Sequence, residues 1–375
     1  MISIRKITTQ AEFESLECVW NPLLESSSSR ALSLTWEWQS TWWQVFGNGG
    51  RELNILIATQ NSQIVGVAPL LRRTAPHYGL PFTRLEFIGA GEDEADEICS
   101  EYLDFIIKQG LETEVVSAFL AYLYEVDTSW DEISLDAVHS ESVNLKAIEE
   151  SRPRNATPHQ IVSIAKGAFI TLPASYQEYF SRLGSNMRRD IRRDRRNVEL
   201  ESAELRIVES EQDFESNFRI LIDLHEARWR PLGQPGAFAS EKFTRFHHLL
   251  ASRILNKGWI KLFILFVAGK PIAGLMVFAF DNKLLIYQSG LAESHSPALH
   301  PGTLIRDMSI EWAIRNGFSE WDMFRSRPGS YKIRWSSHTR DIVGIRLARS
   351  QSKEAIYAAA ARVVDGLRHL RRALG

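Results

Sequence analysis

A group of polar, aromatic and cationic residues follows one apolar segment near the end of the chain. Glu320–Phe324 has the composition of a strand, and Tyr331 and Lys332 come shortly after it. Ligands of α/β proteins bind where strands end. A phenol at such a place can give a proton to a leaving group, and an ammonium can stabilise an oxyanion. We therefore predict catalytic roles for Tyr331 and Lys332, with ordinary loop residues anchored by Trp335 as the competing interpretation.

A second group of candidates lies in Leu224–Arg230, a segment of helical character. His225 and Glu226 are candidate bases, and Arg228 is a candidate anion-binding cation. His225 and Arg228 are three residues apart and share a helix face, whereas Glu226 points elsewhere. A lone histidine near a tryptophan, here Trp229, is more often structural. Both interpretations stay open at this level.

The third place is the start of a helix. Gln288–Gly290 ends a strand, a long loop follows, and Pro301–Thr303 opens a helix with Leu304 and Met308 at a spacing of four. The N-terminus of a helix offers backbone N–H groups and the positive end of the helix dipole, and glycine lets an anion approach. The pattern predicts an anion site, and an ordinary N-cap is the alternative.

The elements that must position these residues occur twice along the chain. A hairpin about Asn61–Gln63 resembles one about Gly269–Lys270, and strands and a helix follow each of them in the same order. Such a repeat predicts two copies of one α/β unit, although two hairpins can look alike by chance. The expected fold is therefore α/β (α+β), with a mixed twisted sheet flanked by helices in residues 1–160 and another in 161–375.

Composition narrows the class of protein. A chain of 375 residues is long enough for two domains. With 44 basic and 46 acidic residues the net charge is −2, which argues against a nucleic-acid coat or a polybasic membrane binder. Two cysteines and an N-terminus without an apolar signal segment indicate a reducing, cytoplasmic location. The apolar stretch Trp259–Phe280 is interrupted by Gly269–Pro271, so it predicts two strands and not a membrane span.

Several other features have simple interpretations. Six arginines between Arg188 and Arg196 predict a solvated helix face, or else a patch for the phosphates of a nucleotide cofactor or an RNA. The acidic run Glu92–Glu97 is interpreted as a solvated connection. Ser352–Leu374 is amphipathic, which favours a docked C-terminal helix over peripheral contact with a membrane.

Two local patterns resemble known binding motifs, but the residues around them do not support a binding site. Gly89–Gly91 follows a strand as a dinucleotide-binding loop does, but Glu94 takes the place of the third glycine and nearby acids would repel a pyrophosphate. His247 and His248 are interpreted as solvated structural residues. No spacing of histidines and cysteines supports a metal site.

Taken together, these residues resemble the tandem-GNAT acyltransferases of the cellulose-biosynthesis accessory (CelD-like) type, relatives of the Fem-type peptidoglycan aminoacyltransferases. No single motif is specific, and their order and spacing carry the resemblance. The matching residues are Thr41–Trp43, Val65–Leu70, Tyr102–Asp104, Gly184 with the arginine run, Leu224–His225, Arg228–Trp229, Pro235–Phe238, Pro301–Gly302, Asp322, Tyr331–Lys332 and Trp335.

The resemblance implies an acyl-CoA site in the second copy, with acetyl-CoA as the expected co-substrate and no metal. An amine acceptor would attack the thioester directly, with His225 or Glu226 orienting or deprotonating the amine, Lys332 stabilising the oxyanion and Tyr331 protonating the thiolate. The implied cofactor-binding residues are Gln288, Ser289, Gly290, Pro301, Gly302, Thr303 and Leu304. The implied substrate-binding residues are Arg228, Trp229, Asp322, Arg325, Arg327 and Trp335. The strands Lys283–Gln288 and Glu320–Phe324 would splay to admit the pantetheine.

The first copy should be degenerate, because an acidic loop follows Ile88 where a Pro-Gly-Thr helix start is expected. The second copy departs from the family at Arg325–Pro328, where added cations suggest an acidic or phosphorylated acceptor. The expected function is N-acyl transfer to a small-molecule, sugar or lipid amine in envelope, polysaccharide or lipid biosynthesis. The alternatives are Fem-like transfer from aminoacyl-tRNA, disfavoured by the small net charge, and a non-catalytic accessory protein of exopolysaccharide synthesis.

Overall fold

The protein is described by a computed structural model, in which the chain divides into two compact units. The described residues are 1–77, 80–151, 159–293, 298–326, 332, 335–336 and 338–349. Unit 1 comprises Met1–Glu92, Cys99–Ile164 and residues 341–349, and unit 2 comprises Asp93–Ile98 and Ala165–Arg340. We expected a single boundary at 160/161. Instead, the acidic segment Asp93–Ile98 belongs to unit 2, and the chain returns to unit 1 at residue 341. The segment 152–158 near the expected boundary and the expected C-terminal helix Ser352–Leu374 lie outside the described residues.

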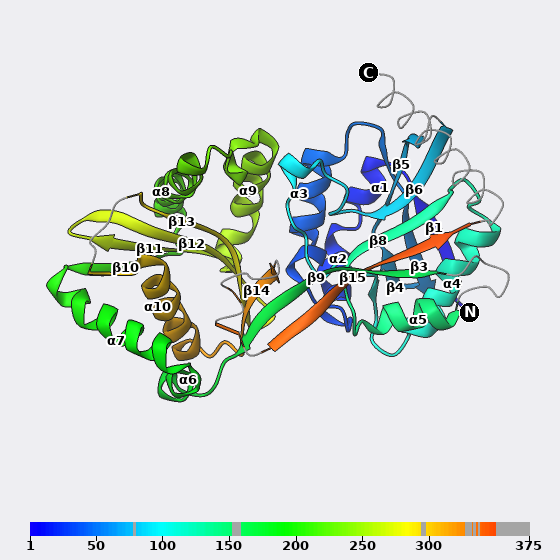
Figure 1. The fold of residues 1–375 in the computed structure, drawn as a ribbon. Helices are drawn as coiled ribbons and strands as arrows, with labels where there is room; N and C mark the ends of the chain where they lie inside the picture. The colour runs from blue at the N-terminus through cyan, green and yellow to red at the C-terminus, as the bar shows by residue number, and fades with distance from the viewer. Residues whose placement is uncertain are drawn as a thin grey trace, which may run out of the picture. The chain divides into compact units, whose positions relative to one another are not determined.

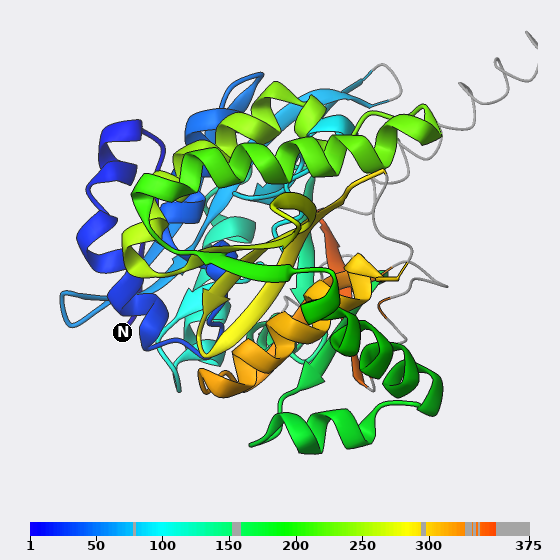
Figure 2. The same cartoon turned by 90° about the vertical axis from the view of Figure 1, so that its left-hand side faces the viewer.

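Unit 2 is a sheet with helices on both faces. The strand order is β10-β11-β12-β13-β14-β9, and all neighbours are antiparallel except β13 and β14, which are parallel. The strands are β9 (Gln160–Thr171), β10 (Ala203–Val208), β11 (Ile260–Val267), β12 (Lys270–Phe280), β13 (Lys283–Leu291) and β14 (Glu320–Ser326). The helices are α6 (Tyr176–Arg182), α7 (Ser185–Leu200), α8 (Glu211–Trp229), α9 (Glu241–Ile254) and α10 (Pro301–Arg315). Figure 1 shows α8 and α9 on one face, with α10, α6 and α7 on the other, and Figure 2 shows the same layers from the side.

Local sequence explains the main elements of unit 2. β11 is apolar almost throughout and buried on both faces, as expected for a strand covered by helices on each side. The hydroxyl of Ser210 accepts the Asp213 amide at the start of α8, and that of Ser240 accepts the Phe243 amide at the start of α9. α10 ends before Gly317, which has a φ of +77°.

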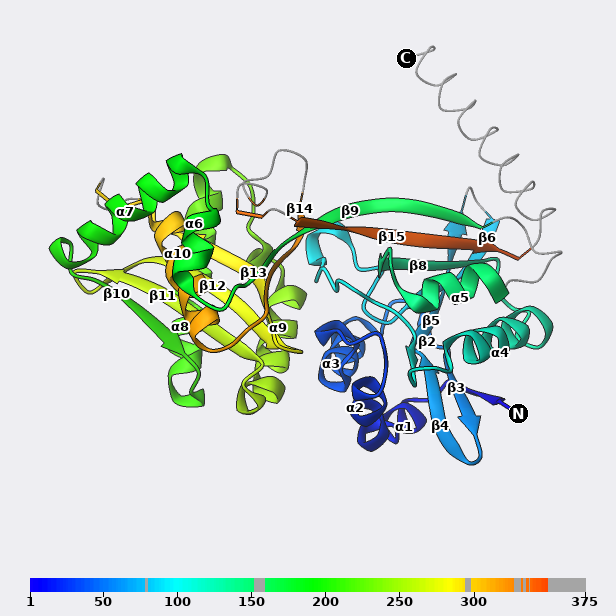
Figure 3. The same ribbon diagram turned by 90° about the horizontal axis from the view of Figure 1, so that it is seen from below.

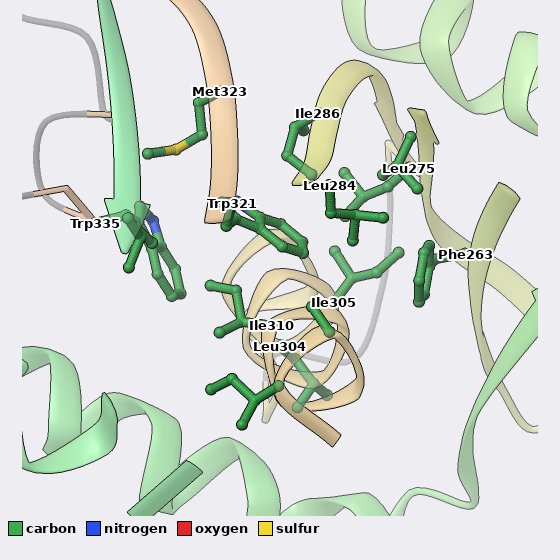
Figure 4. Packing of buried hydrophobic residues seen from close by; sticks show 14 of the residues in the cluster. Phe263, Leu275, Leu284, Ile286, Leu304, Ile305, Ile310, Trp321, Met323 and Trp335 are labelled. Carbon is green, nitrogen blue, oxygen red and sulfur yellow. The ribbon is translucent and has the colours of Figure 1, made fainter. Parts of the chain in front are cut away.

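The core of unit 2 joins α10 to the sheet. Figure 4 shows Leu304, Ile305 and Ile310 of α10 with Trp321 of β14 and Leu284 of β13, and all five side chains are at most 1% exposed. Burying such side chains contributes about 1.5–3 kcal/mol each. This packing fixes the start of α10 relative to the two parallel strands.

Unit 1 holds a four-stranded sheet with the order β1-β3-β4-β7 and a second row of strands, β15-β8-β6-β5-β2. Its strands are β1 (Ser3–Ile7), β2 (Arg51–Leu53), β3 (Ile55–Gln60), β4 (Gln63–Ala68), β5 (Leu70–His77), β6 (Leu80–Phe87), β7 (Ile106–Ile107), β8 (Glu132–His139) and β15 (His338–Ala348), which begins in unit 2. Its helices are α1 (Gln10–Glu14), α2 (Glu17–Glu25), α3 (Trp36–Phe46), α4 (Glu112–Glu125) and α5 (Val143–Ser151). Figure 3 shows α4 and α5 side by side. Short 3₁₀ turns are η1 (Leu32–Leu34), η2 (Glu94–Asp96), η3 (Arg230–Leu232), η4 (Ala237–Ala239) and η5 (Leu255–Lys257).

The two units repeat one order of elements. In unit 1, strand β1 and helices precede the β3–β4 hairpin, and β7, α4 and β8 complete the series. In unit 2, β10 and helices precede the β11–β12 hairpin, and β13, α10 and β14 follow. The hairpins aligned in the sequence are thus equivalent in the fold. Unit 1 differs because the β5–β6 hairpin is inserted after β4, and β7, which takes the place of β13, is only two residues long.

Candidate active site

The two parallel strands of unit 2 separate soon after they pair. Only three residue pairs join β13 to β14, from Lys283↔Glu320 to Leu285↔Asp322, although β13 runs on to Leu291 and β14 to Ser326. Each strand also carries a register shift at this point, which increases local twist. The expected splay is therefore present, and it leaves strand edges suited to pairing with an extended amide-containing chain.

Asp322 sets the irregularity in β14. Its side chain is fully buried, and Oδ1 accepts the Phe324 amide at 2.7 Å. Phe324 has a φ of +54°, a left-handed conformation that non-glycine residues adopt only when their surroundings hold them there. Oδ2 lies 3.7 Å from a guanidinium nitrogen of Arg340. Asp322 was predicted to bind substrate, and the structure instead gives it a role in shaping the strand.

Lys332 acts on the same strand. Its Nζ donates to the carbonyls of Met323 and Arg325, at 2.5 and 2.7 Å. The ammonium thus lies at the splayed end of β14, where catalysis was expected, and it is bonded to the backbone there. Trp335, predicted to contact substrate, is 7% exposed and packs in the core cluster. Tyr331 and Arg327 lie outside the described residues.

The start of α10 has only part of the expected character, because Pro301 has no N–H and two of the amides that follow are bonded within the turn. The amides of Thr303 and Leu304 both donate to the His300 carbonyl at 2.9 Å. Within the described part of the chain no side chain caps this helix start, and its first turn contains no acidic residue. The positive end of the helix dipole therefore meets no negative charge from its own first turn. Leu304, by contrast, is buried in the core, so its side chain is not a contact for a cofactor.

His225 connects three elements. Its Nδ1 donates to the Ser289 carbonyl of β13 at 3.0 Å, and its Nε2 accepts the Ala237 amide at 3.2 Å. This pattern requires the neutral Nδ1–H tautomer, and burial lowers the pKa of His225. Because both ring nitrogens are engaged by the backbone, the structure favours a positioning role for His225 over the predicted role as a base.

Two glycines allow this close packing. A Cβ on Gly290 would lie 2.4 Å from the His225 backbone nitrogen, and one on Gly236 would lie 2.3 Å from Glu226 Oε1. Gly290, predicted to contact the cofactor, is therefore required for packing of α8 on β13. Gln288 pairs with Met276 in the β12–β13 ladder.

Glu226, next to His225 in α8, has a buried carboxylate oxygen. Its Oε1 is buried and has no hydrogen-bond partner within the described residues. The indole nitrogen of Trp229, one turn further along α8, is also buried without a partner there. Arg228 is exposed, 3.5 Å from the Ser289 hydroxyl, with its guanidinium over the Trp229 ring. The residues predicted on α8 thus lie together, and Glu226 Oε1 is left without a hydrogen bond in the described part of the chain, whereas both ring nitrogens of His225 are bonded.

The acidic segment Asp93–Ile98 is exposed at Asp93–Ala95 and Glu97, as expected of a solvated connection, but it also contacts the strands of unit 2. Tyr287 of β13 donates to the Ile98 carbonyl at 2.5 Å, and Arg325 of β14 binds Glu97 at 2.7 Å. Both contacts lie beyond the last β13–β14 pair, so the segment spans the separated strands. Ser240 and Lys242 bind Asp96, and the Ser240 hydrogen bond lowers the pKa of that carboxyl. Sequence analysis missed this element because its partners are about 140–230 positions away.

Among the described residues, no group of three or more histidine, cysteine, aspartate or glutamate side chains is placed to hold a metal ion. None of the described helices combines the length and apolar character that crossing a bilayer requires.

Comparison with known proteins agrees with this geometry. Residues 185–332 match the family model described as an acetyltransferase (GNAT) domain. The chain is similar in structure to FemX, with a TM-score of 0.64 and 11% identity over 95% of this chain and 100% of that one. It is also similar to the C-terminal domain of a putative lysylphosphatidylglycerol synthetase from Agrobacterium fabrum, with a TM-score of 0.53 and 7% identity over 95% of this chain and 97% of that one. For L-PGS from Bacillus licheniformis the TM-score is 0.51 at 10% identity, covering 95% of each chain.

At these identities the structural similarities establish the fold alone. No curated protein matches the sequence. Residues 185–332, which contain the splayed strands, α8 and the start of α10, thus match a GNAT-type acetyltransferase domain, and 95% of the chain is similar in fold to FemX.

Proposed function

We propose that this protein is an N-acyltransferase that moves an acyl group from acyl-CoA, with acetyl-CoA the first candidate, to an amine. The observation that carries the proposal is the early end of β13–β14 pairing, at Leu285↔Asp322, beside a helix start without an acid of its own. GNAT domains use acyl-CoA, and the match over 185–332 covers these elements. The splayed strand edges suit the amides of pantetheine, and the start of α10 suits a pyrophosphate.

The reaction requires one proton to leave and one to arrive. The amine nitrogen bonds to the acyl carbonyl carbon, the carbon–sulfur bond breaks, the amine proton goes to a base and the thiolate takes up a proton. We assign the base to Glu226, because its buried Oε1 lacks a partner within the described residues. His225 holds α8 against β13, and Lys332 holds the end of β14. Tyr331 is retained as the proposed donor to the thiolate.

Substitution of Glu226, the proposed base, tests the chemical step separately from the binding of acetyl-CoA. Glu226→Gln is expected to lower amine-dependent release of free thiol from acetyl-CoA by roughly 10²–10⁴-fold and to leave acetyl-CoA binding unchanged. Glu215→Gln on the exposed part of the same helix is the matched control and should behave as the wild type. The assay uses a panel of amino sugars and lipid amines. Wild-type rates in Glu226→Gln would exclude Glu226 as the base.

The donor is identified by calorimetric titration of the purified protein with acetyl-CoA, longer acyl-CoAs and aminoacyl-tRNA. Binding of a CoA thioester at one site per chain supports the proposal. Binding of tRNA without CoA would favour the Fem-like alternative. Binding of neither would leave an accessory protein. Native mass spectrometry of the isolated protein would reveal the acyl mass of any co-purified thioester.

The acceptor class is part of the same proposal. Arg325 carries positive charge at the end of β14, and the Glu97 carboxylate already binds it. We propose an acceptor with a carboxylate or phosphate that exchanges with Glu97, in polysaccharide, envelope or lipid synthesis. A CelD-like role in cellulose or exopolysaccharide production is one version of this proposal.

A further inference from the structure

The arginine-rich helix α7 has two different faces. The inward face carries Ile191 and Asp194, which are 1% and 0% exposed, together with Arg195. Four other arginines, at a spacing of three, one and three, share the outward face. They are Arg189, Arg192, Arg193 and Arg196, and we call them the arginine stripe.

Arg195 fixes α7 on α10. Its Nε lies 2.6 Å from Oδ2 of Asp307, which is fully buried, and its Nη1 lies 2.7 Å from Glu311. Its guanidinium also stacks on Tyr176, whose hydroxyl donates to Asp307. All these partners of Arg195 lie in unit 2. Because they attach α7 to α10, they also hold the arginine stripe beside α10.

One end of the stripe meets the start of α10. Asp194 is buried and its Oδ1 lies 3.1 Å from His300 Nδ1, while the guanidinium of Arg193 lies 3.5 Å from the same oxygen and 2.9 Å from His300 Nε2. Asn197 donates to the Ala298 carbonyl at 2.8 Å. His300 immediately precedes α10. A buried carboxylate thus orients a half-exposed arginine next to the proposed pyrophosphate site.

The stripe extends the positive surface beyond what a pyrophosphate needs. From Arg189 to Arg196 it covers about 10 Å of helix. Its side chains reach solvent, with Arg189 74% and Arg193 43% exposed. Arginine binds phosphate through paired N–H groups and stays charged at all relevant pH values. Four arginines on one short helix, in a chain of net charge −2, fit a few phosphates better than the long backbone of a nucleic acid.

We propose that the arginine stripe binds the ribose 3′-phosphate of the CoA nucleotide and so makes the enzyme selective for CoA over its dephosphorylated form. This inference rests on the proposed function, because it needs CoA to bind at the start of α10. It gives α7 a role in donor recognition that neither the strand opening nor the helix start supplies.

The test is a calorimetric comparison of CoA with dephospho-CoA, which lacks only the 3′-phosphate. The wild type should bind CoA at least about tenfold more tightly, the value of one charge-assisted hydrogen bond. Arg192→Gln/Arg196→Gln, which leaves Arg193 in place beside His300, should lose that preference while keeping its affinity for dephospho-CoA. Arg189→Gln/Arg196→Gln, which touches no buried partner in the described residues, gives a second variant that should fold normally. Arg206→Gln, an exposed arginine on β10, is the matched control.

The outcomes separate the two proposals. If the wild type binds CoA and dephospho-CoA equally, the stripe inference is wrong and the acyltransferase proposal stands. If CoA does not bind at all, both fail. If both stripe variants keep the tenfold preference, the 3′-phosphate is recognised elsewhere. If the variants lose binding of deacylated tRNA and keep CoA selectivity, the stripe serves RNA and the inference is overturned.

Discussion

The equivalent helices α4 of unit 1 and α10 of unit 2 begin in opposite ways. α4 begins at Glu112, which is 7% exposed and accepts hydrogen bonds from the Gly110 amide at 2.7 Å and the Ser28 hydroxyl at 3.0 Å. Glu114 adds a second acid to its first turn. α10 begins at Pro301 and has no acid in its first turn. Both helix dipoles favour an anion at the N-terminus, and unit 1 supplies its own, whereas unit 2 does not.

The preceding strands differ in the same sense. β7 has two residues and pairs with β4, whereas β13 has nine, of which the last six extend beyond its pairing with β14. The described residues of unit 1 therefore contain neither feature on which the proposed donor site rests, the long strand edge and the uncompensated helix end. We expected this degeneracy at the acidic loop after Ile88, but that loop is not the counterpart of the start of α10 in the order of elements. The counterpart is Gly110–Glu112.

The largest expected effect is on how α10 is held. α4 packs through apolar side chains such as Val115 and Phe119, whereas α10 adds to its apolar packing an ion pair between Arg195, 32% exposed, and the fully buried Asp307. Arg195→Met leaves a buried carboxylate without its cation and should lower the stability of unit 2 by about 3 kcal/mol. Thermal and urea unfolding measure the change.

Arg315→Met is the matched control for Arg195→Met. Arg315 binds Glu311 as well, but it is 73% exposed, so its loss should cost less than about 1 kcal/mol. Equal effects of the two substitutions would show that burial of Asp307 does not distinguish α10 from α4.

The next effect converts the start of α10 to the pattern of α4. Thr303→Glu places a carboxylate in the first turn, where it stabilises the helix and repels the CoA pyrophosphate. We expect CoA binding to weaken about a hundredfold, or about 2.7 kcal/mol, with no loss of thermal stability. Thr303→Gln has nearly the same shape without the charge and should bind within a few-fold of the wild type.

A hundredfold loss in both Thr303 variants would mean that contact with the threonine, and not the charge of the helix start, determines binding. The comparison between α4 and α10 would then no longer explain why only one copy carries the site.

Local patterns were enough to predict much of the fold. The two hairpins and the helix after Pro301 all follow from periodicity and turn residues that lie within a few positions of each other. The splay of β13 and β14 was expected from the family resemblance, and the pairing confirms it.

The rest depends on partners far away in the chain. From the sequence, Gly290 was predicted to contact a ligand. In the fold, a Cβ added at Gly290 would lie 2.4 Å from the backbone nitrogen of His225 in α8. Asp322 and Trp335 were predicted to contact substrate, but both side chains are buried in the fold. Residue type alone does not distinguish a side chain that binds a ligand from one that binds the backbone of another element.

Buried aromatic helices give a final comparison between the units. α3 in unit 1 and α9 in unit 2 both precede the hairpin of their unit. Trp38 of α3 is 2% exposed and donates to Ser100 at 2.9 Å, and its indole does not titrate. His247 of α9 was expected to be solvated, but it is 1% exposed among Phe243, Phe246 and Tyr287. Burial lowers its pKa to about 3.

The difference predicts that acid destabilises unit 2 before unit 1. Between the ordinary pKa of 6.5 and the folded value of about 3, the unfolded chain binds a proton at His247 that the folded chain does not. Stability therefore falls as the pH falls below 6.5, by about 1.4 kcal/mol per pH unit, or about 2 kcal/mol at pH 5. His247→Gln should remove that part of the pH dependence, whereas His248→Gln, whose side chain is 38% exposed, should keep it. Amide hydrogen exchange at pH 7 and pH 5, corrected for intrinsic rates, should show protection lost in α9 and retained in α3; equal loss in both would contradict the assignment to His247.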